Sequence, residues 1–172
     1  MLSMGTSATA SMGVVIAHHN SNLSQVLDEV RKCEKEGKSV KDKNAFCIAL
    51  AKRAGGTEHI KAKWYYNESH FESIPLLRQW ADAFYHDYIS PKFVYTFRTE
   101  TKGLEGLPTQ AVSLELLSIA DRQRNKKAKD FDKDKMVELV AGLIKLHNCG
   151  HSLDALGKFL SLAAFMGREG NR

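Results

Sequence analysis

Residues 132–166 read DKDKMVELVAGLIKLHNCGHSLDALGKFLSLAAFM, and this stretch decides the class of fold. Apolar residues recur every three or four positions on both sides of a central turn, which is the spacing of two amphipathic helices. Ser152 stands where a helix cap is expected, and Gly150 suits the left-handed residue that ends a helix. The stretch therefore predicts a helical hairpin, with helices over 132–147 and 152–166.

The same spacing extends toward the N-terminus and predicts further helices. Asn22 can cap the first of them, and Pro91 ends another because the residue before a proline avoids the helical region. The segment 59–67 fits both a helical turn and a strand alternation, and we favour a helix there because Thr57 followed by Glu58 is a good helix start. The other helices are predicted over 23–36, 39–55, 75–90 and 109–126.

Residues 93–101 are the one strongly β-prone stretch, because aromatic and β-branched residues dominate it. A lone strand would have nothing to pair with, so the segment must find a partner or serve as an extended linker. We therefore expect a mainly α protein. The predicted architecture is a compact bundle of about six or seven helices, with at most one short extended segment near 92–101.

The first 27 residues contain no Asp, Glu, Lys or Arg. We predict a flexible N-terminal arm over 1–21, with the alternative that residues 14–16 dock on the core or on a neighbouring copy. Residues 22–167 form a single helical domain in this prediction, and 168–172 form a tail. Glycines and a proline between 102 and 109 mark a candidate hinge. Sub-lobes over 22–101 and 109–167 are the alternative to one undivided bundle.

The composition is that of an ordinary globular domain. The chain has 172 residues, of which 43% are hydrophobic and 26% charged, enough for a normal core. No apolar run approaches the roughly 20 residues that a membrane span needs, so no membrane association is predicted. Three cysteines do not suggest a disulfide framework. The sequence thus favours a reducing, cytoplasmic location.

Charge is the main functional signal in the sequence. The net charge is +5, and a basic protein has an acidic partner as its simplest ligand. Five cations fall within eight residues, and such a cluster can follow a phosphate backbone. The alternative is a solvated helix end whose cations only complement the helix dipole. The predicted nucleic-acid contacts are Arg122, Arg124, Lys126, Lys127 and Lys129, supported by Lys61 and Lys63 beside the aromatic residues 64–66.

The sequence carries no recognisable catalytic or metal motif. The run from His147 to His151 contains two histidines and Cys149, but a tight helix turn would hardly arrange them around one ion. Cys33 and Cys47 lie on predicted apolar helix faces, where a thiol behaves as a small hydrophobe. The last helix is too apolar to read the major groove of DNA. We therefore predict no catalytic residues, no metal and no cofactor.

Together these patterns predict a non-catalytic protein that binds a nucleic acid through its backbone, RNA or a single strand more than specific duplex DNA. It would work within an oligomer or larger assembly. The alternative is a helical interaction or scaffold subunit that binds proteins or itself, with its charge serving only solubility. In that case the aromatic-rich stretch 80–97 would form an exposed interface. No motif in the chain identifies a known family.

Overall fold

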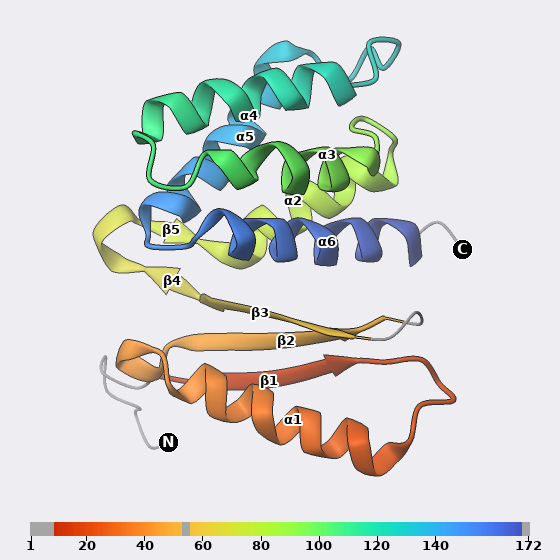
Figure 1. Cartoon of the computed structure of the whole chain (residues 1–172), viewed down its shortest axis with the longest axis vertical. Coiled ribbons are helices and arrows are strands. Elements are labelled where there is room, and N and C mark those ends of the chain that lie inside the picture. The colour runs from red at the N-terminus through yellow and green to blue at the C-terminus, as the bar shows by residue number, and fades with distance from the viewer. Residues whose placement is uncertain (1–8, 53–55, 170–172) are drawn as a thin grey trace, which may run out of the picture. The chain divides into compact units, whose positions relative to one another are not determined.

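The computed structural model describes residues 9–52 and 56–169 (Figure 1). Over these residues helices predominate, as predicted, but the protein is not a pure helical bundle because it also contains a β-sheet. The chain divides into two compact units, Met1–Tyr66 and Asn67–Arg172. No helix in the described residues is long and apolar enough to cross a membrane.

Unit 1 is built on a β-α-β connection. Its central strand pairs in parallel with the first strand and antiparallel with the third, with Val14 opposite Ile48 and Ile48 opposite Ile60. One helix connects the two parallel strands and lies along one face of the sheet (Figure 1). The elements of unit 1 are β1 (Ser11–Ile16), α1 (Leu23–Lys38), β2 (Ala45–Ala51), β3 (Thr57–Lys63) and β4 (Tyr65–Tyr66), with a short 3₁₀ turn at Lys41–Lys43.

Two glycines allow α1 to approach the sheet closely. A Cβ on Gly13 of β1 would stand 2.4 Å from the backbone nitrogen of Glu34, and one on Gly37 of α1 would stand 3.2 Å from the carbonyl oxygen of Met12. The helix backbone therefore packs almost directly on the strand. Cys33 of α1 and Cys47 of β2 are both fully buried, in one cluster.

The predicted helix over 39–55 is wrong, because residues 45–51 form the central strand β2. The segment AFCIALA is a short, nearly continuous apolar run, and such a run is typical of a strand covered on both faces. Its alanines and leucine fit either state locally. The paired strands β1 and β3 decide the outcome.

The helix favoured over 59–67 is also wrong, because residues 57–63 form β3. The alternation that the sequence displays is the correct reading: Ile60 and Ala62 are buried, and Lys61 between them is exposed. The strand pairs along its length with β2, so the backbone groups on that edge of β3 are hydrogen-bonded within the sheet.

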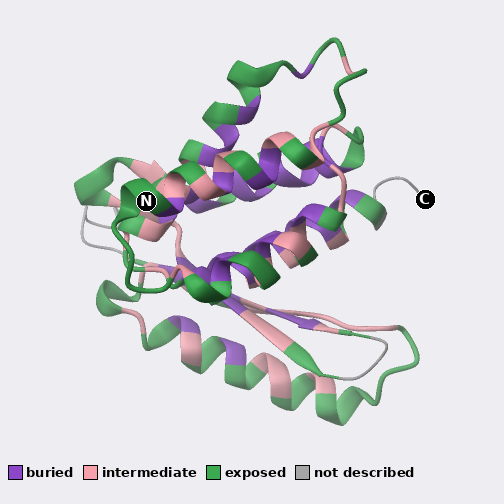
Figure 2. Cartoon of the chain, turned by 45° about the horizontal axis from the view of Figure 1, so that its top comes forward, coloured by how far each residue is buried: buried purple, intermediate pink, exposed green. Residues whose placement is uncertain are grey.

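Unit 2 is helical. At its centre the Trp80 ring stacks on Phe93 with centroids 5.0 Å apart, and Phe84 and Phe97 extend this aromatic core. Figure 2 shows the buried positions gathered along one side of these helices. The elements are β5 (Phe71–Glu72), α2 (Ser73–Tyr85), α3 (Lys92–Glu100), α4 (Thr109–Gln123), α5 (Lys133–Asn148) and α6 (Leu153–Glu169), with 3₁₀ turns at Asn67–Ser69 and Thr101–Gly103.

The extended segment expected near 92–101 is instead the helix α3. Phe93 and Phe97, four residues apart, are fully buried, whereas Tyr95 between them is 76% exposed. An alternating strand would place all three on one face. The stripe formed by Phe93 and Phe97 has the helical period, and their contact with the Trp80 core overrides the β propensity of the segment.

The chain termini differ from the prediction where the structure describes them. Ser11–Ile16, inside the expected arm 1–21, is the strand β1 and pairs with β2 from Ser11↔Ala45 to Ile16↔Leu50. This agrees with the alternative in which residues 14–16 dock on the core. Residues 1–8 of the arm lie outside the described residues. Of the tail expected over 168–172, Arg168 and Glu169 instead belong to α6, and residues 170–172 lie outside the described residues.

Candidate functional site

Residues 124–131, here called the lysine loop, connect α4 to α5 and are held in place at their start. Ile89 and Arg124 form an isolated β-bridge. The backbone nitrogen of Asn125 donates to the carbonyl oxygen of Tyr88 at 2.8 Å. At the other end the Phe131 ring stacks on Tyr88, with centroids 5.0 Å apart and planes 9° apart. The loop is therefore fixed to the segment that follows α2.

Three lysines project from this loop into solvent. Lys126, Lys127 and Lys129 are exposed, and none of them forms an ion pair with a described residue. The Asn125 side chain accepts a hydrogen bond from the Lys127 backbone nitrogen at 3.0 Å, which fixes the turn that carries them. Three positively charged side chains thus lie close together in sequence, and none of them pairs with a described carboxylate.

The two arginines predicted beside them are engaged within the protein. Arg122 forms ion pairs with Glu100 and, at 3.7 Å, with Glu115. The Arg124 side chain is only 16% exposed and donates to Asp121 and to the carbonyl oxygen of Phe131, both at 3.4 Å. Arg124 therefore stabilises the lysine loop, and Arg122 links α3 to α4.

The two supporting lysines belong to unit 1. Lys61 is exposed, whereas Lys63 forms an ion pair with Asp42 at 3.0 Å. The neighbouring Trp64 donates from Nε1 to the carbonyl oxygen of Ala10 at 3.0 Å, and its ring contacts Phe46. Trp64 is thus a structural residue of unit 1.

A pocket of about 310 Å³ lies beside the lysine loop and includes the Tyr88–Phe131 ring pair in its wall. Asp82 and Glu138 offer carboxylate oxygens, Gln79 offers an amide, and Lys135 offers one cation. Such a wall combines an aromatic surface with hydrogen-bonding groups. The lining residues are Gln79, Asp82, Ala83, Tyr88, Phe131, Lys135, Glu138 and Leu139.

A second constellation lies between α1 and the sheet of unit 1. The ligand atoms of Cys33, Cys47 and His59 all lie within 4.8 Å of one another, and we call these three residues the cysteine–histidine cluster. Cys33 comes from α1, Cys47 from β2 and His59 from β3. Three elements far apart in sequence therefore converge on one point.

Two carboxylates of α1 complete this cluster. Oε1 of Glu36 lies 2.8 Å from Nδ1 of His59, and its Oε2 lies 3.6 Å from Sγ of Cys47. On the other side of the ring, Glu29 contacts Nε2 of His59. Because a neutral imidazole has one donor nitrogen, both contacts are hydrogen bonds only when both ring nitrogens carry a proton.

The environment raises the pKa of the two cysteines and lowers the pKa of Glu29. Burial raises the pKa of the Cys33 thiol, and burial together with the neighbouring Cys33 raises the pKa of Cys47, so both are protonated at neutral pH. Desolvation opposes ionisation of Glu29, but hydrogen bonds from His59 and Lys32 outweigh it and lower the pKa of this carboxyl. The cluster thus pairs buried neutral thiols with an ionised carboxylate.

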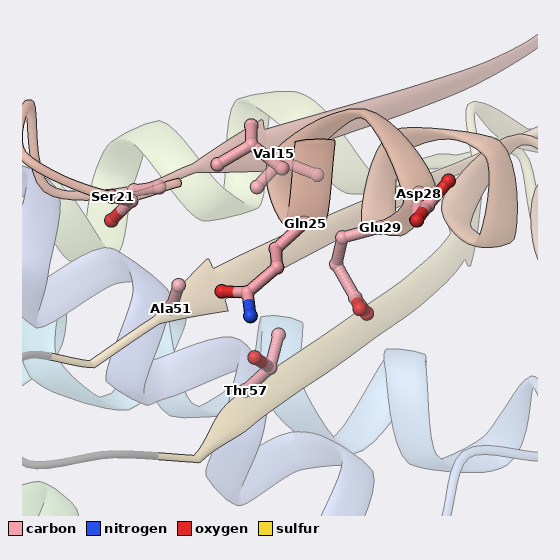
Figure 3. Close-up of a pocket in the computed structure, with 9 residues that line it drawn as sticks. Val15, Ser21, Gln25, Asp28, Glu29, Ala51 and Thr57 are labelled. Atoms are coloured by element: carbon pink, nitrogen blue, oxygen red, sulfur yellow. The ribbon is translucent and has the colours of Figure 1, made fainter. Parts of the chain in front are cut away.

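A pocket of about 410 Å³ opens next to the cluster, where β1 and β2 end and α1 begins. Figure 3 shows Gln25 and Glu29 projecting from α1 toward the side where Thr57 lies, whereas Asp28 points away. Glu29 lines this pocket and also contacts His59, so the pocket leads from solvent to the edge of the cluster. The Glu29 carboxylate in its wall favours a cation over a phosphate.

The turn from His147 to His151 forms no ligand set. Nδ1 of His147 donates to the carbonyl oxygen of His151 at 2.7 Å, and Sγ of Cys149 lies 3.4 Å from the Ser69 hydroxyl. Gly150 has the left-handed φ of 95° that the sequence predicts. These contacts of the turn therefore serve to end α5 and to begin α6.

The sequence prediction of no metal residues overlooked the cysteine–histidine cluster. The sequence places Cys33 and Cys47 on predicted apolar helix faces and assigns no role to His59. The available signal was the alternation over 57–63, which places His59, Lys61 and Lys63 on one face of a strand. Without the sheet register, nothing connects His59 to either cysteine.

Comparisons of the chain with protein-family models, with curated proteins and with solved structures found no match.

Proposed function

We propose that the protein binds the phosphate backbone of a nucleic acid, RNA or a single strand, through the lysine loop. The observation that supports this most is the set Lys126, Lys127 and Lys129, which are exposed and form no ion pair with a described residue, on a loop that is fixed at both ends. In this proposal the protein is a non-catalytic component of an oligomer or larger assembly.

The proposal follows from the cost of holding like charges together. Three neighbouring ammonium groups repel one another, and a phosphate chain relieves this repulsion while releasing its condensed counterions. An ammonium is a point charge that binds phosphate without reading a base, so little sequence preference is expected. The intramolecular pairs of Arg122, Arg124 and Lys63 compete with phosphate, and we therefore assign the contacts to the three loop lysines with Lys61 in support.

The adjoining pocket favours a single strand as the ligand. Unpaired bases can leave the stack and enter a recess, whereas the bases of a duplex cannot. Beside the lysine loop the Tyr88–Phe131 ring pair offers an aromatic surface, and Gln79 and Asp82 offer hydrogen-bonding groups for a base edge. The pocket carboxylates repel phosphate, which keeps the backbone on the lysine side.

The test is binding of the purified chain to a labelled random-sequence RNA strand at about 50 and about 200 mM salt. Each phosphate contact on a single strand contributes about −0.7 to the slope of log K against log salt. A triple variant with Lys126→Ala, Lys127→Ala and Lys129→Ala should therefore flatten the slope by about 2 and weaken binding for every sequence.

The matched control removes the same charge elsewhere in unit 2. Lys92, Lys102 and Lys145 are exposed and have no ion pair with a described residue, so their triple replacement by alanine changes the net charge equally. This control should bind nearly as wild type. Equal losses in both variants, or no binding by the wild type at low salt, would contradict the proposal.

The alternative function is a protein interaction surface in the stretch 80–97. Trp80 is fully buried and belongs to the core, whereas Tyr85 is 40% exposed and Tyr95 is 76% exposed. Single exposed aromatics are common on protein surfaces and do not by themselves mark an interface. Failure of RNA binding, with a copurifying protein lost on Tyr95→Ala, would favour this alternative.

A further inference from the structure

We propose that Cys33, Cys47, His59 and Glu36 form a binding site for a zinc-like divalent cation that ties α1 to the sheet of unit 1. This proposal is independent of nucleic-acid binding, since every residue that it uses belongs to α1, β2 or β3.

The spacing of the four side chains fits a tetrahedral ion. Zinc–sulfur bonds of about 2.3 Å and zinc–nitrogen bonds of about 2.0 Å give a tetrahedron whose edges are about 3.3–3.8 Å. Sγ of Cys47 and Oε2 of Glu36 are 3.6 Å apart, and Oε1 of Glu36 and Nδ1 of His59 are 2.8 Å apart. The sulfur and nitrogen atoms lie within 4.8 Å of one another. Closing separations of up to 4.8 Å to these edge lengths requires side-chain movements of about 1 Å.

The donor types select the class of metal. Two thiolates and an imidazole suit zinc and similar borderline-soft ions, whereas calcium and magnesium require shells made mostly of oxygen. Each thiol that binds the ion releases its proton to solvent, because the thiolate is the ligand. Because Cys33 and Cys47 are fully buried, their sulfur atoms do not have to be stripped of water when the ion binds.

Glu29 has a different role from Glu36. Histidine ligands commonly donate their second ring N–H to a carboxylate, which fixes the tautomer and the ring orientation. When Nδ1 of His59 binds the ion, Nε2 carries that proton and faces Glu29. Because the side chains of Glu36 and His59 are partly exposed, an ion can reach the site from solvent.

The register of unit 1 builds this site. His59 stands opposite Ala49 in the antiparallel pair, two residues along β2 from Cys47 and on the same face. Cys33 and Glu36 are three residues apart in α1 and so share one side of the helix. The close approach permitted by Gly13 brings that side onto the sheet.

The experiment uses the untagged full chain, reduced with a phosphine, freed of chelator and titrated with Co²⁺ and then Zn²⁺. One equivalent of Co²⁺ should bind and give the thiolate charge-transfer and tetrahedral visible bands, and Zn²⁺ should displace it. Cys47→Ser should weaken binding at least about 100-fold, more than the loss of an outer partner of a ligand causes, and reduce the charge-transfer band. Cys149→Ser, which alters the partly buried cysteine outside the cluster, is the control and should bind as wild type.

A second variant distinguishes the loss of a metal ligand from the loss of the folded structure. Glu36→Gln preserves the volume of the side chain but removes its charge, so the circular dichroism spectrum should stay unchanged while affinity falls by at least about 100-fold, more than the loss of an outer partner causes. The proposal is overturned if the reduced wild type binds no Co²⁺ or if Cys149→Ser loses as much affinity as Cys47→Ser. A Cys33–Cys47 disulfide in the purified chain, with no metal uptake after reduction, would also overturn it.

Discussion

At the scale of single residues, His59 connects two carboxylates of α1. Its two ring nitrogens face Glu36 and Glu29, and Glu29 also pairs with Lys32 at 3.3 Å. The Glu29 side chain is 19% exposed, so solvent only partly screens these contacts. The lowered pKa of Glu29 is the result of this environment and makes the stability of the protein depend on pH.

Acidification should therefore destabilise the wild type through Glu29. Because its pKa in the folded protein lies below the ordinary 4.5, the ionised carboxylate stabilises the fold above that value. This contribution is lost as pH falls through the lowered pKa, since the unfolded chain takes up the proton more readily. Urea unfolding in the presence of chelator at about pH 7 and about pH 3.5 should show a smaller drop for Glu29→Gln than for wild type. Asp28→Asn, which changes an exposed carboxylate of the same helix, is the control, and an equal drop in wild type and Glu29→Gln would refute the assignment.

At the scale of elements, the contact between α1 and β1 depends on the missing side chain of Gly13. Helices usually stand off a sheet by the thickness of their side chains, but here the backbone at Glu34 and Cys33 occupies the place of a Cβ. This approach buries the sheet-facing side of α1 over Cys47 and Ala49. The position of the cysteine–histidine cluster follows from this packing.

Gly13→Ala should accordingly destabilise unit 1. The new methyl group would stand 2.4 Å from the Glu34 nitrogen and 2.9 Å from the Cys33 carbonyl carbon, both backbone atoms that cannot rotate away. Overpacking of this kind costs about 1–3 kcal/mol, and it should also weaken Co²⁺ binding by separating Cys33 from Cys47. Gly103→Ala is the matched control, since no atom lies within 4 Å of its added Cβ, and it should change stability by less than about 0.5 kcal/mol. The measurement is urea unfolding, and equal stabilities of the two variants would contradict the packing argument.

At the scale of the whole molecule, charge is divided unevenly between the two units. Residues 1–66 contain ten lysines and arginines against six aspartates and glutamates, whereas residues 67–172 contain fifteen against fourteen. The net positive charge therefore lies mostly in unit 1, although the lysine loop belongs to unit 2. A local cluster of unpaired cations, and not the overall charge of a unit, distinguishes the loop.

Hydrogen exchange measured by mass spectrometry should distinguish the proposed metal site from the proposed RNA site. A ligand that binds only the folded form slows the exchange of the elements that it connects. Zn²⁺ should therefore protect amides of α1, β2 and β3 more than those of α4 and α5, whereas RNA should protect the lysine loop. Protection by Zn²⁺ that is as strong in α5 as in α1 would count against a site in unit 1.

Much of the helical structure could be predicted because its signals are local. The helices predicted over 23–36, 109–126, 132–147 and 152–166 exist with ends shifted by a few residues. Their caps are also confirmed: the Asn22 side chain accepts from the Ser24 nitrogen, and Ser152 accepts from the Ala155 nitrogen. Periods of three and four residues and caps two or three residues away lie within a single segment, so sequence reasoning reaches them.

By itself the sequence determined a mainly helical chain, the two helices α5 and α6 with the turn between them, and the cluster of cations around 122–129. The tertiary structure decided that Arg122 and Arg124 form ion pairs, that residues 45–51 are a strand and 92–100 a helix, and that Cys33, Cys47 and His59 meet. These outcomes depend on partners tens of residues away along the chain. A strand gains its hydrogen bonds, and a ligand set its geometry, only from such distant segments, whereas a helix satisfies its backbone within four residues.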